Sequence, residues 1–542
     1  MAVRRFFEAF ALLLVPFIIL ALPRLLESTV RASEPQQANV APCGVVDGFD
    51  FPFPDIDVSR TDFGIYRARW GGLHVGIDVA FYRHGEPVRA AARGRVTYSN
   101  IEGWDTEKGV VVLQHTFPDG TLINTLYGHM EELNGYVFPP MGACVERGDI
   151  IGAVGDPERS APHLHYEVRT RYRHEGGPGY TTTNPLTLGW LHPVDFTYLA
   201  RVWIDPAYRG HVSLADKMIV PPAVLPGGGL VVAHSRYLEG INPLGESLWR
   251  FDTAGSVLDL IALPDGRIVA ITSDNQVLIL QHGAVSRLWL LPGRVSAGAF
   301  VDGDRLVVVL EREMVAAYSL DGVPLWAAGP FAGGLAHWAH SGDRYAFAGV
   351  DGVLHIFTRT GERILESRFD FAPVLFPASE GAFIVLSDDR LLWLDPALSL
   401  VPIATLPRQA TADARVVTSA DGLIYLYPGE GRSLYAYDLA GELLWIGYLP
   451  GMHLRPPCLA AGNGLVYALT TDGLLLSFDA SDGRLLTEHQ LYTGGSDGAG
   501  SARWLDVGTD GVVRFSAGYL TIAALDGQML LASRQADERT AG

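Results

Sequence analysis

Two histidines that lie two residues apart, His163 and His165, stand in the stretch SAPHLHYEVR at residues 160–169. In a β-strand, successive side chains alternate between faces, so both imidazoles would share one face with Glu167 and Arg169. The apolar residues between them would point the other way. This pattern suits a site that binds a metal or moves protons, but it also describes an exposed polar stripe over an apolar one. Further candidate ligands elsewhere in the chain would favour the site over the exposed stripe.

A second candidate pair, His74 and Asp78, lies in the stretch GGLHVGIDVA. In a straight strand these residues would share a face but lie roughly 13 Å apart, which is too far for one metal ion. Gly76, which stands between them, permits a bend or bulge that would bring both side chains inward. Alone, the H-x-x-x-D spacing carries little weight.

The third candidate is His129, in VVVLQHTFPDGTLINTLYGHMEEL. Alternating apolar residues on both sides of the PDG turn at residues 118–120 predict a β-hairpin whose second strand ends near His129. A single histidine in such a place usually makes one structural hydrogen bond. We expect that role for His84, His115 and His192, which match no metal site.

Together these segments supply four histidines and one aspartate, a chemical mix that suits zinc. A catalytic zinc ion takes three nitrogen or oxygen ligands from the protein and keeps a fourth position for water, whose pKa falls to near neutrality. Two histidines and one aspartate would complete such a site. The sequence therefore predicts a hydrolytic zinc centre.

The order of these motifs resembles the lysostaphin-like (LytM-type) zinc endopeptidases of bacterial cell walls. The shared elements are G-x-x-H-x-G-x-D-x-A, GEPVxA, GRV, YGH and PHLHYEVR, and the likeness runs from Phe63 to Phe196. The family hydrolyses peptide bonds of peptidoglycan, either in cross-bridges or in stem peptides, by a zinc-activated water. The resemblance thus implies an exported peptidase that uses one zinc ion.

The resemblance also assigns roles. It implies zinc ligands at His74, Asp78 and His165. His163 and His129 would be the catalytic pair that does not bind the metal. They would orient and deprotonate the water and stabilise the developing oxyanion.

An arginine-rich insertion, RTRYRHEGGPGYTTTNPLTLGW, departs from the family pattern and is either a substrate-binding lip or a solvated loop. Some family members have lost their ligands and only activate other hydrolases, whereas all five positions are filled here. The alternative function is therefore a non-catalytic wall-binding or hydrolase-activating envelope protein whose second half is an interaction scaffold.

The second half of the chain repeats. Turn glycines recur at intervals mostly near 40 residues, each followed by short apolar strands; they are Gly228, Gly266, Gly303, Gly342, Gly381, Gly422, Gly464 and Gly511. Such a repeat of four strands is typical of a β-propeller, here with eight units between about 218 and 535. Its tryptophan and Asp-Gly rhythm resembles the PQQ-like (quinoprotein-like) repeat. Enzymes of that class that hold the quinone commonly use a vicinal cysteine pair, which this half lacks, so we expect a scaffold and no bound cofactor other than zinc.

Length and composition agree with this organisation. A chain of 542 residues exceeds one hydrophobic core, and 61 glycines with few helix-favouring runs favour all-β structure. We predict a small antiparallel β-sheet peptidase domain followed by a β-propeller. The predicted division is 1–32 signal peptide or N-terminal membrane anchor, 33–45 linker, 46–200 peptidase domain, 201–217 linker, 218–535 propeller and 536–542 tail.

The amino terminus predicts export to the periplasm, the cell envelope or the medium. Arg4 and Arg5 precede the apolar residues 6–22, and small residues at 30–32 suit a signal peptidase. Cleaved signal and retained membrane anchor both fit this pattern. In an oxidising compartment Cys43 and Cys144 either form a disulfide or remain two separate thiols.

The net charge bears on the partners. At −19, with no cluster of lysine and arginine, it excludes nucleic acid as a partner, because binding a phosphate backbone requires such a cluster. The expected partners are peptidoglycan peptides and an envelope protein that docks on the propeller.

Overall fold

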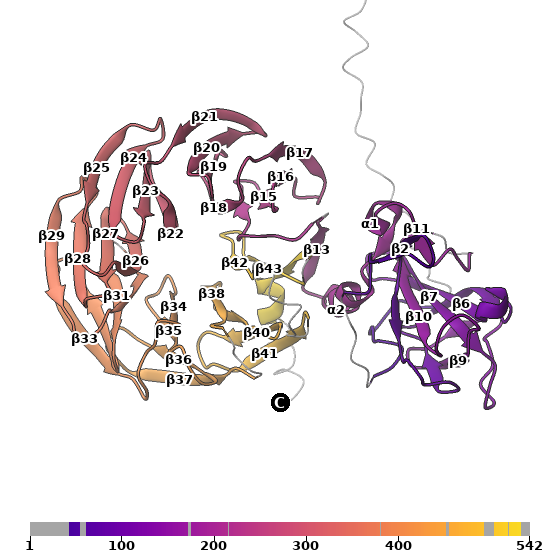
Figure 1. Cartoon of the computed structure of the whole chain (residues 1–542). Helices are drawn as coiled ribbons and strands as arrows, with labels where there is room; N and C mark the ends of the chain where they lie inside the picture. Colours follow the sequence, from indigo (N-terminus) through magenta and orange to yellow (C-terminus); the bar gives the residue numbers. More distant parts are fainter. Residues whose placement is uncertain are drawn as a thin grey trace, which may run out of the picture.

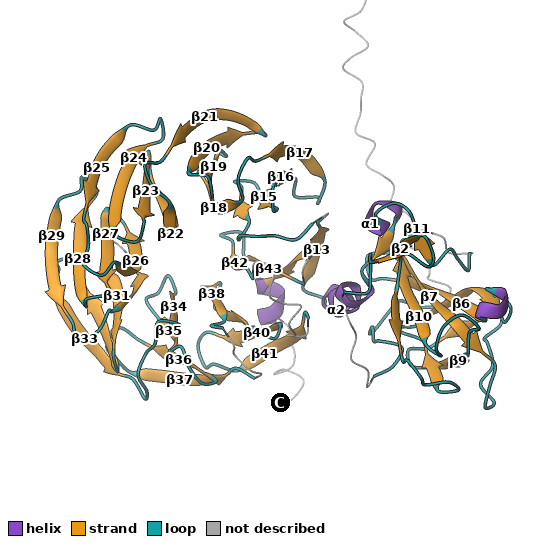
Figure 2. Ribbon diagram, in the orientation of Figure 1, coloured by secondary structure: helices purple, strands orange, loops and turns teal. Residues whose placement is uncertain are grey.

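The computed structural model describes residues 43–54, 61–171, 175–214, 216–379, 381–450, 455–492, 503–518 and 520–532. These residues form two β-rich parts, and helix α2 (Pro193–Trp203) lies between them (Figures 1 and 2). The prediction of an all-β chain is confirmed. The predicted signal or anchor at residues 1–32 and the tail at 536–542 fall outside the described residues. Within those ranges, no helix is long and apolar enough to span a bilayer.

The amino-terminal part contains two antiparallel sheets. The larger has the order β12-β10-β7-β6-β5-β8, with β3 on β10, β9 on β7 and β4 on β9. Its strands are β3 (Ile77–Val79), β4 (Pro87–Arg89), β5 (Gly94–Asn100), β6 (Gly109–Thr116), β7 (Leu122–Glu131), β8 (Cys144–Val145), β9 (Ile150–Val154), β10 (Leu164–Arg169) and β12 (Trp190–Leu191). The smaller has the order β1-β2-β11, from β1 (Tyr66–Arg67), β2 (Gly72–His74) and β11 (Tyr180–Thr181). Two short helices, η1 (Asp105–Glu107) and α1 (Pro185–Leu188), lie in connections.

The predicted hairpin is formed by β6 and β7. They pair antiparallel from Thr116 opposite Leu122 to Gly109 opposite Met130. At the turn Gly120 has a φ of +84°, a value that favours glycine. His129 lies near the end of β7, as the sequence predicts.

Strand β10 is buried on both faces. Leu164, Tyr166 and Val168 belong to the core of this part, as predicted. The opposite face, with Glu167 and Arg169, is buried as well. The interpretation of the histidine pair as part of an exposed polar stripe is therefore wrong.

Cys43 and Cys144 form a disulfide, with their Cα atoms 5.4 Å apart, so the pairing that the sequence left open is present. Cys144 lies in β8, which pairs with β5 at the edge of the larger sheet. The disulfide ties the first described residues to this edge.

The carboxyl-terminal part is a ring of eight four-stranded antiparallel sheets (Figure 1). Seven of them use four consecutive strands each: β14 (Ala223–Val224), β15 (Leu230–Ala233), β16 (Tyr237–Ile241), β17 (Ser247–Asp252); β18 (Val257–Ala262), β19 (Ile268–Thr272), β20 (Gln276–Gln281), β21 (Ala284–Leu290); β22 (Val295–Asp302), β23 (Arg305–Leu310), β24 (Met314–Ser319), β25 (Pro324–Ala328); β26 (Leu335–Ser341), β27 (Arg344–Gly349), β28 (Val353–Thr358), β29 (Arg363–Arg368); β30 (Val374–Pro377), β31 (Phe383–Ser387), β32 (Arg390–Leu394), β33 (Leu400–Thr405); β34 (Arg415–Thr418), β35 (Ile424–Tyr427), β36 (Ser433–Tyr437), β37 (Leu443–Tyr448); β38 (Cys458–Gly462), β39 (Leu465–Leu469), β40 (Leu474–Asp479) and β41 (Leu485–Gln490).

The eighth sheet closes the ring and begins earlier in the chain than expected. It has the order β13-β44-β43-β42, from β13 (Tyr208–Ser213), β42 (Leu505–Val507), β43 (Val512–Ser516) and β44 (Thr521–Asp526). The sequence places β13 in the linker at 201–217, whereas the structure pairs it with the last strand. Strand β13 is the fourth strand of this sheet although it comes first in the chain. It lies before Gly228, the first turn glycine of the repeat, so the repeat pattern does not predict it.

The tryptophan rhythm of the repeat has a packing cause. In four instances a tryptophan on the fourth strand of one sheet lies against a turn glycine of the next sheet, so closely that a Cβ on the glycine would come within 2.5–2.8 Å of the indole. The pairs are Trp249 with Gly283, Trp289 with Gly322, Trp326 with Gly361 and Trp445 with Gly483. Only glycine leaves room for the indole, so the two residue types recur together.

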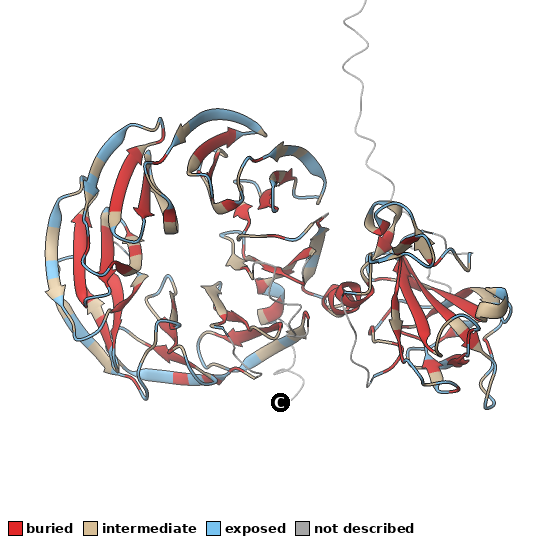
Figure 3. Cartoon of the chain, viewed as in Figure 1, coloured by how far each residue is buried: buried red, intermediate tan, exposed pale blue. Residues whose placement is uncertain are grey.

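Within each sheet the middle strands are buried and the fourth strands are largely exposed (Figure 3). Strand β19 is buried throughout, for example, whereas β21 is exposed along almost its whole length. The sheets therefore stack through their inner strands.

Helix α2 belongs to both hydrophobic cores. Val194, Phe196 and Ala200 lie in the core of the amino-terminal part. Leu199 and Val202 lie in a core cluster with residues of the ring. The two parts are therefore packed together through one helix.

Truncation of Leu199 tests this shared packing. Leu199→Ala should lower the free energy of unfolding by about 2–5 kcal/mol, because it leaves a cavity in a buried cluster. Leu244→Ala, at a side chain that is 83% exposed, should change it by no more than about 0.5 kcal/mol. Denaturant unfolding measures both, and equal effects would contradict the shared core.

His115 predicts a loss of stability in acid. Its ring nitrogens lie 2.8 Å from the Arg93 carbonyl oxygen and 2.8 Å from Thr125 Oγ1. Burial lowers the pKa of His115 to about 4 from 6.5. Between pH 6.5 and 4 the imidazole is therefore protonated in the unfolded chain but neutral in the folded one. The free energy of unfolding should fall by up to about 3 kcal/mol as the pH drops through this range. In His115→Gln this part of the pH dependence of unfolding should be missing.

Candidate metal centre

The strand pairing brings three of the predicted ligands together. His74 ends β2, Asp78 lies in β3, and His165 lies directly opposite Asp78 in β10. One ligand atom from each of the three lies within 4.8 Å of the others. The chain turns between β2 and β3 at Gly76, where a Cβ would lie only 2.6 Å from the Tyr166 carbonyl oxygen and 2.9 Å from the His165 ring. Glycine at this position allows both side chains to face one point.

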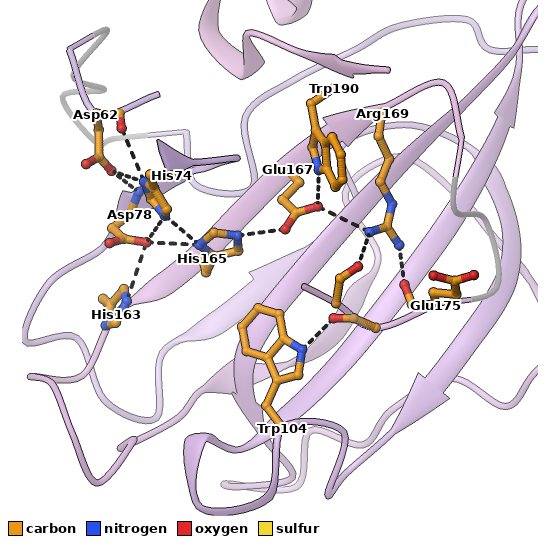
Figure 4. A network of polar contacts seen from close by, with 12 residues as sticks. Asp62, His74, Asp78, Trp104, His163, His165, Glu167, Arg169, Glu175 and Trp190 are labelled. Atoms are coloured by element: carbon orange, nitrogen blue, oxygen red, sulfur yellow. Dashed lines mark hydrogen bonds and ion pairs between the residues drawn. The ribbon is translucent and has the colours of Figure 1, made fainter. Parts of the chain in front are cut away.

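The three side chains converge closely (Figure 4). His74 Nε2 lies 2.9 Å from His165 Nδ1 and 3.3 Å from Asp78 Oδ1. His165 Nδ1 lies 3.1 Å from the same carboxylate oxygen. Two ring nitrogens and one carboxylate oxygen therefore share one small volume.

The outer nitrogens of the two histidines face oxygen acceptors. His74 Nδ1 lies 3.2 Å from the Asp62 carbonyl oxygen and 3.3 Å from Asp62 Oδ2. His165 Nε2 lies 2.9 Å from Glu167 Oε1. These oxygens favour the tautomer with the N–H on the outer side, in which the neutral ring directs a lone pair inward. Two imidazole lone pairs and one carboxylate suit a zinc ion with an open position.

The other two predicted residues border the same point. His163 donates from Nδ1 to the Ala161 carbonyl oxygen at 2.7 Å, and its Nε2 lies 3.5 Å from Asp78 Oδ1. His129 donates from Nδ1 to the Glu107 carbonyl oxygen at 2.7 Å. The rings of His129 and His163 lie 4.5 Å apart between centroids. The structure thus gathers all five predicted residues.

Burial and hydrogen bonds set the charges in the site. Burial opposes a charge on His74, but hydrogen bonds to Asp62 and Asp78 outweigh it and raise the pKa of His74 to about 10 as long as no cation is bound, so a metal ion would displace a proton from this ring. Burial would raise the pKa of Asp78, yet its hydrogen bonds to the neighbouring histidines hold it well below the usual value. Burial, with the nearby His163 and His165, lowers the pKa of His129 to about 3. Asp78 is therefore an anion and His129 is neutral near pH 7.

Several site residues were not predicted. Asp62 contacts His74, and Tyr180 stacks on the His74 ring with centroids 5.3 Å apart. Trp104 lies against His129 and His165, with centroid distances of 4.9 and 5.4 Å. Tyr180 comes from the arginine-rich insertion, so the described portion of that insertion contributes to the site. The position of Glu167 on the same face as His165 was the one signal that the sequence offered.

The three histidines for which the sequence predicts a structural role all make such contacts. His84 Nε2 lies 3.0 Å from Glu131 Oε2, and His115 is enclosed as described above. His192 caps the amino terminus of α2 by accepting from the Asp195 amide.

Comparison with known proteins supports both parts. Residues 72–177 match the family model "Peptidase family M23", and residues 311–540 match the model "Outer membrane protein assembly factor BamB". The two-domain resemblance, a LytM-type peptidase domain followed by PQQ-like repeats, is confirmed. The M23 match supports a peptidase.

The chain is also similar to single known proteins. The outer membrane protein assembly factor BamB of Nitrosomonas eutropha is 32% identical over 124 residues, which is 23% of this chain and 28% of that protein. The crystal structure of BamB from Moraxella catarrhalis has a TM-score of 0.46 at 17% identity and covers 58% of this chain and 96% of that one. Saccharomyces cerevisiae Sqt1 has a TM-score of 0.48 at 12% identity and covers 59% of this chain and 98% of that one.

Gly128 allows Trp104 to reach the site, and a mutant cycle tests this. A Cβ at Gly128 would lie 2.3 Å from the Trp104 ring, so Gly128→Ala should destabilise the protein by about 1–3 kcal/mol. In a Trp104→Leu background the overlap is gone, and Gly128→Ala should cost clearly less. Denaturant unfolding of the four proteins measures the coupling, and additive effects would contradict the contact.

Proposed function

We propose that this protein is an exported zinc metalloendopeptidase that hydrolyses peptide bonds in peptidoglycan, in cross-bridges or stem peptides. The observation that carries the proposal is the convergence of His74, Asp78 and His165, with both ring N–H groups turned outward. The M23 match of this part supports the reaction class. The propeller would serve recognition or docking.

His74, Asp78 and His165 would hold the zinc ion. When bound, zinc polarises the scissile carbonyl and makes water acidic enough to attack near neutral pH. Asp78 contributes the negative charge, and Asp62 would keep the His74 imidazole in the orientation that zinc requires.

His163 would move the proton. Its Nδ1–H is engaged by the Ala161 carbonyl oxygen, so Nε2 is the free basic atom, and it lies 3.5 Å from Asp78 Oδ1. This nitrogen would take a proton from the attacking water. The same nitrogen then donates to the leaving amine.

His129 would orient the water. Its Nδ1–H is donated to the Glu107 carbonyl oxygen, and its low pKa keeps the ring neutral, so Nε2 accepts a hydrogen bond. This favours positioning of the water by His129, and the protonated His163 is then the donor available to the developing oxyanion.

An envelope location would suit both parts. Residues 311–540 match the model of an outer membrane protein assembly factor, and a Cys43–Cys144 disulfide suits an oxidising compartment. We therefore infer export through residues 1–32, with a cleaved signal or an anchor at residues 6–22. The outer strands of the propeller offer surface for an envelope protein.

His163→Ala tests catalysis separately from metal binding. The purified protein should hold one zinc ion per chain and release fragments from cross-linked muropeptides, as followed by mass spectrometry. His163→Ala should keep its zinc but lose about 10²–10⁴-fold in kcat, because the proton carrier is missing. His84→Ala, at a solvent-exposed ion pair of the same domain, serves as the matched control and should cleave like the parent.

Two outcomes would contradict the enzyme. They are a purified protein without zinc, and a His163→Ala variant that cleaves as fast as the parent. Either result would favour the non-catalytic wall-binding or hydrolase-activating alternative.

A further inference from the structure

A row of charged side chains runs inward from the metal centre along one face of β10. After His165 come Glu167 and Arg169, and neither of the two exposes any surface. Removing a carboxylate and a guanidinium from water is costly unless both are well paired. An apolar pair would fill the same space without this cost, so the charges point to a role other than packing.

The Glu167 carboxylate is fully occupied by donors. Its Oε1 lies 2.9 Å from His165 Nε2. Its Oε2 accepts from Trp190 Nε1 at 2.9 Å and from an Arg169 amino group at 3.2 Å. A buried carboxylate that accepts from three donors has one arrangement available.

Arg169 connects this arrangement to the segment that leads to β11. Its guanidinium donates to the carbonyl oxygens of Glu175 and Gly177, and Trp104 Nε1 donates to that of Gly176 (Figure 4). Three successive carbonyls are thus held by side chains of the site. The segment continues to Tyr180, which stacks on His74.

We propose that Glu167 is a positioning residue of the metal centre, held in place by Arg169 and Trp190. By accepting the Nε2–H of His165, Glu167 fixes the ring with its Nδ1 lone pair toward His74 and Asp78. A carboxylate behind an imidazole ligand also makes that ligand more basic, so zinc binds more tightly. Through Arg169 the same network holds residues 175–177, so the metal ligand and this wall of the site keep one relative position. The inference rests on the proposed zinc site and deepens it.

Glu167→Gln is the sharpest substitution, because it keeps the shape and removes the charge. The amide oxygen would still accept from His165, but the amide N–H groups would then face the donors of Trp190 and Arg169. We expect zinc affinity, measured by competition with a chelator, to fall about 10–100-fold. The visible spectrum of the cobalt(II)-substituted protein should also change, since the His165 ring is no longer held in the same orientation.

His115→Gln is the matched control. His115 is buried and hydrogen-bonded in the same sheet but contacts none of the three ligands. The His115→Gln substitution should lower the stability of the protein while leaving its zinc affinity and cobalt spectrum unchanged. This separates a positioning effect from general destabilisation. Should Glu167→Gln fail to fold, Trp190→Phe removes one of the three donors and should weaken zinc binding by a smaller but measurable factor.

The outcomes separate this inference from the proposed function. Zinc affinity within twofold of the parent in folded Glu167→Gln, or unchanged affinity in Trp190→Phe when the former does not fold, would overturn the positioning role. If the parent binds zinc but cleaves no muropeptide, the enzymatic function is contradicted. The positioning role still holds in that case if Glu167→Gln binds zinc more weakly than the parent. A parent that binds no zinc would overturn both.

Discussion

The pairing of β3 with β10 is the constraint on which the site depends. It sets Asp78 directly opposite His165, and β10 in turn pairs with β7, which carries His129. Because side chains alternate along a strand, a slip of one residue would turn His165, the one predicted ligand on β10, away from the centre. The burial of both faces of β10 fixes the register: the apolar face packs into the core, and the polar face is completed by the ion pair of Glu167 and Arg169.

The propeller is attached to this framework through shared packing. Helix α2 gives one set of residues to the core of the amino-terminal part and Leu199 and Val202 to the ring. Just beyond the helix, Asp205 lies 3.1 Å from His489 of β41, and β13 closes the ring. The helix therefore ends in a junction rather than a free linker. A partner of the propeller would therefore be held at a set distance and orientation from the candidate metal site.

The sequence predicted the site better than its surroundings. The roles of the ligands followed from the order of motifs that resembles the LytM-type endopeptidases, and alternation along a strand placed His163 and His165 on one face. The structure gathers all five predicted residues. The role of Glu167 and Arg169 was not foreseen, since a charged face on a strand usually lies in water and only tertiary packing shows that this one does not. Strand β13 was missed because it carries no turn glycine, and the role of Tyr180 was hidden in an insertion without a repeating pattern. The regular recurrence of glycine and tryptophan in the repeats, in contrast, reflects a direct contact between neighbouring sheets.

The proposed function requires that His74, Asp78 and His165 hold one metal ion while His163 stays free to move a proton. The most direct test is a crystal structure of the zinc-loaded protein with an anomalous difference map collected at the zinc edge. The account predicts a single peak bound by His74 Nε2, an Asp78 carboxylate oxygen and His165 Nδ1, with His163 outside the coordination sphere. A peak bound by His163 in place of His165, or a peak away from these side chains, would contradict it.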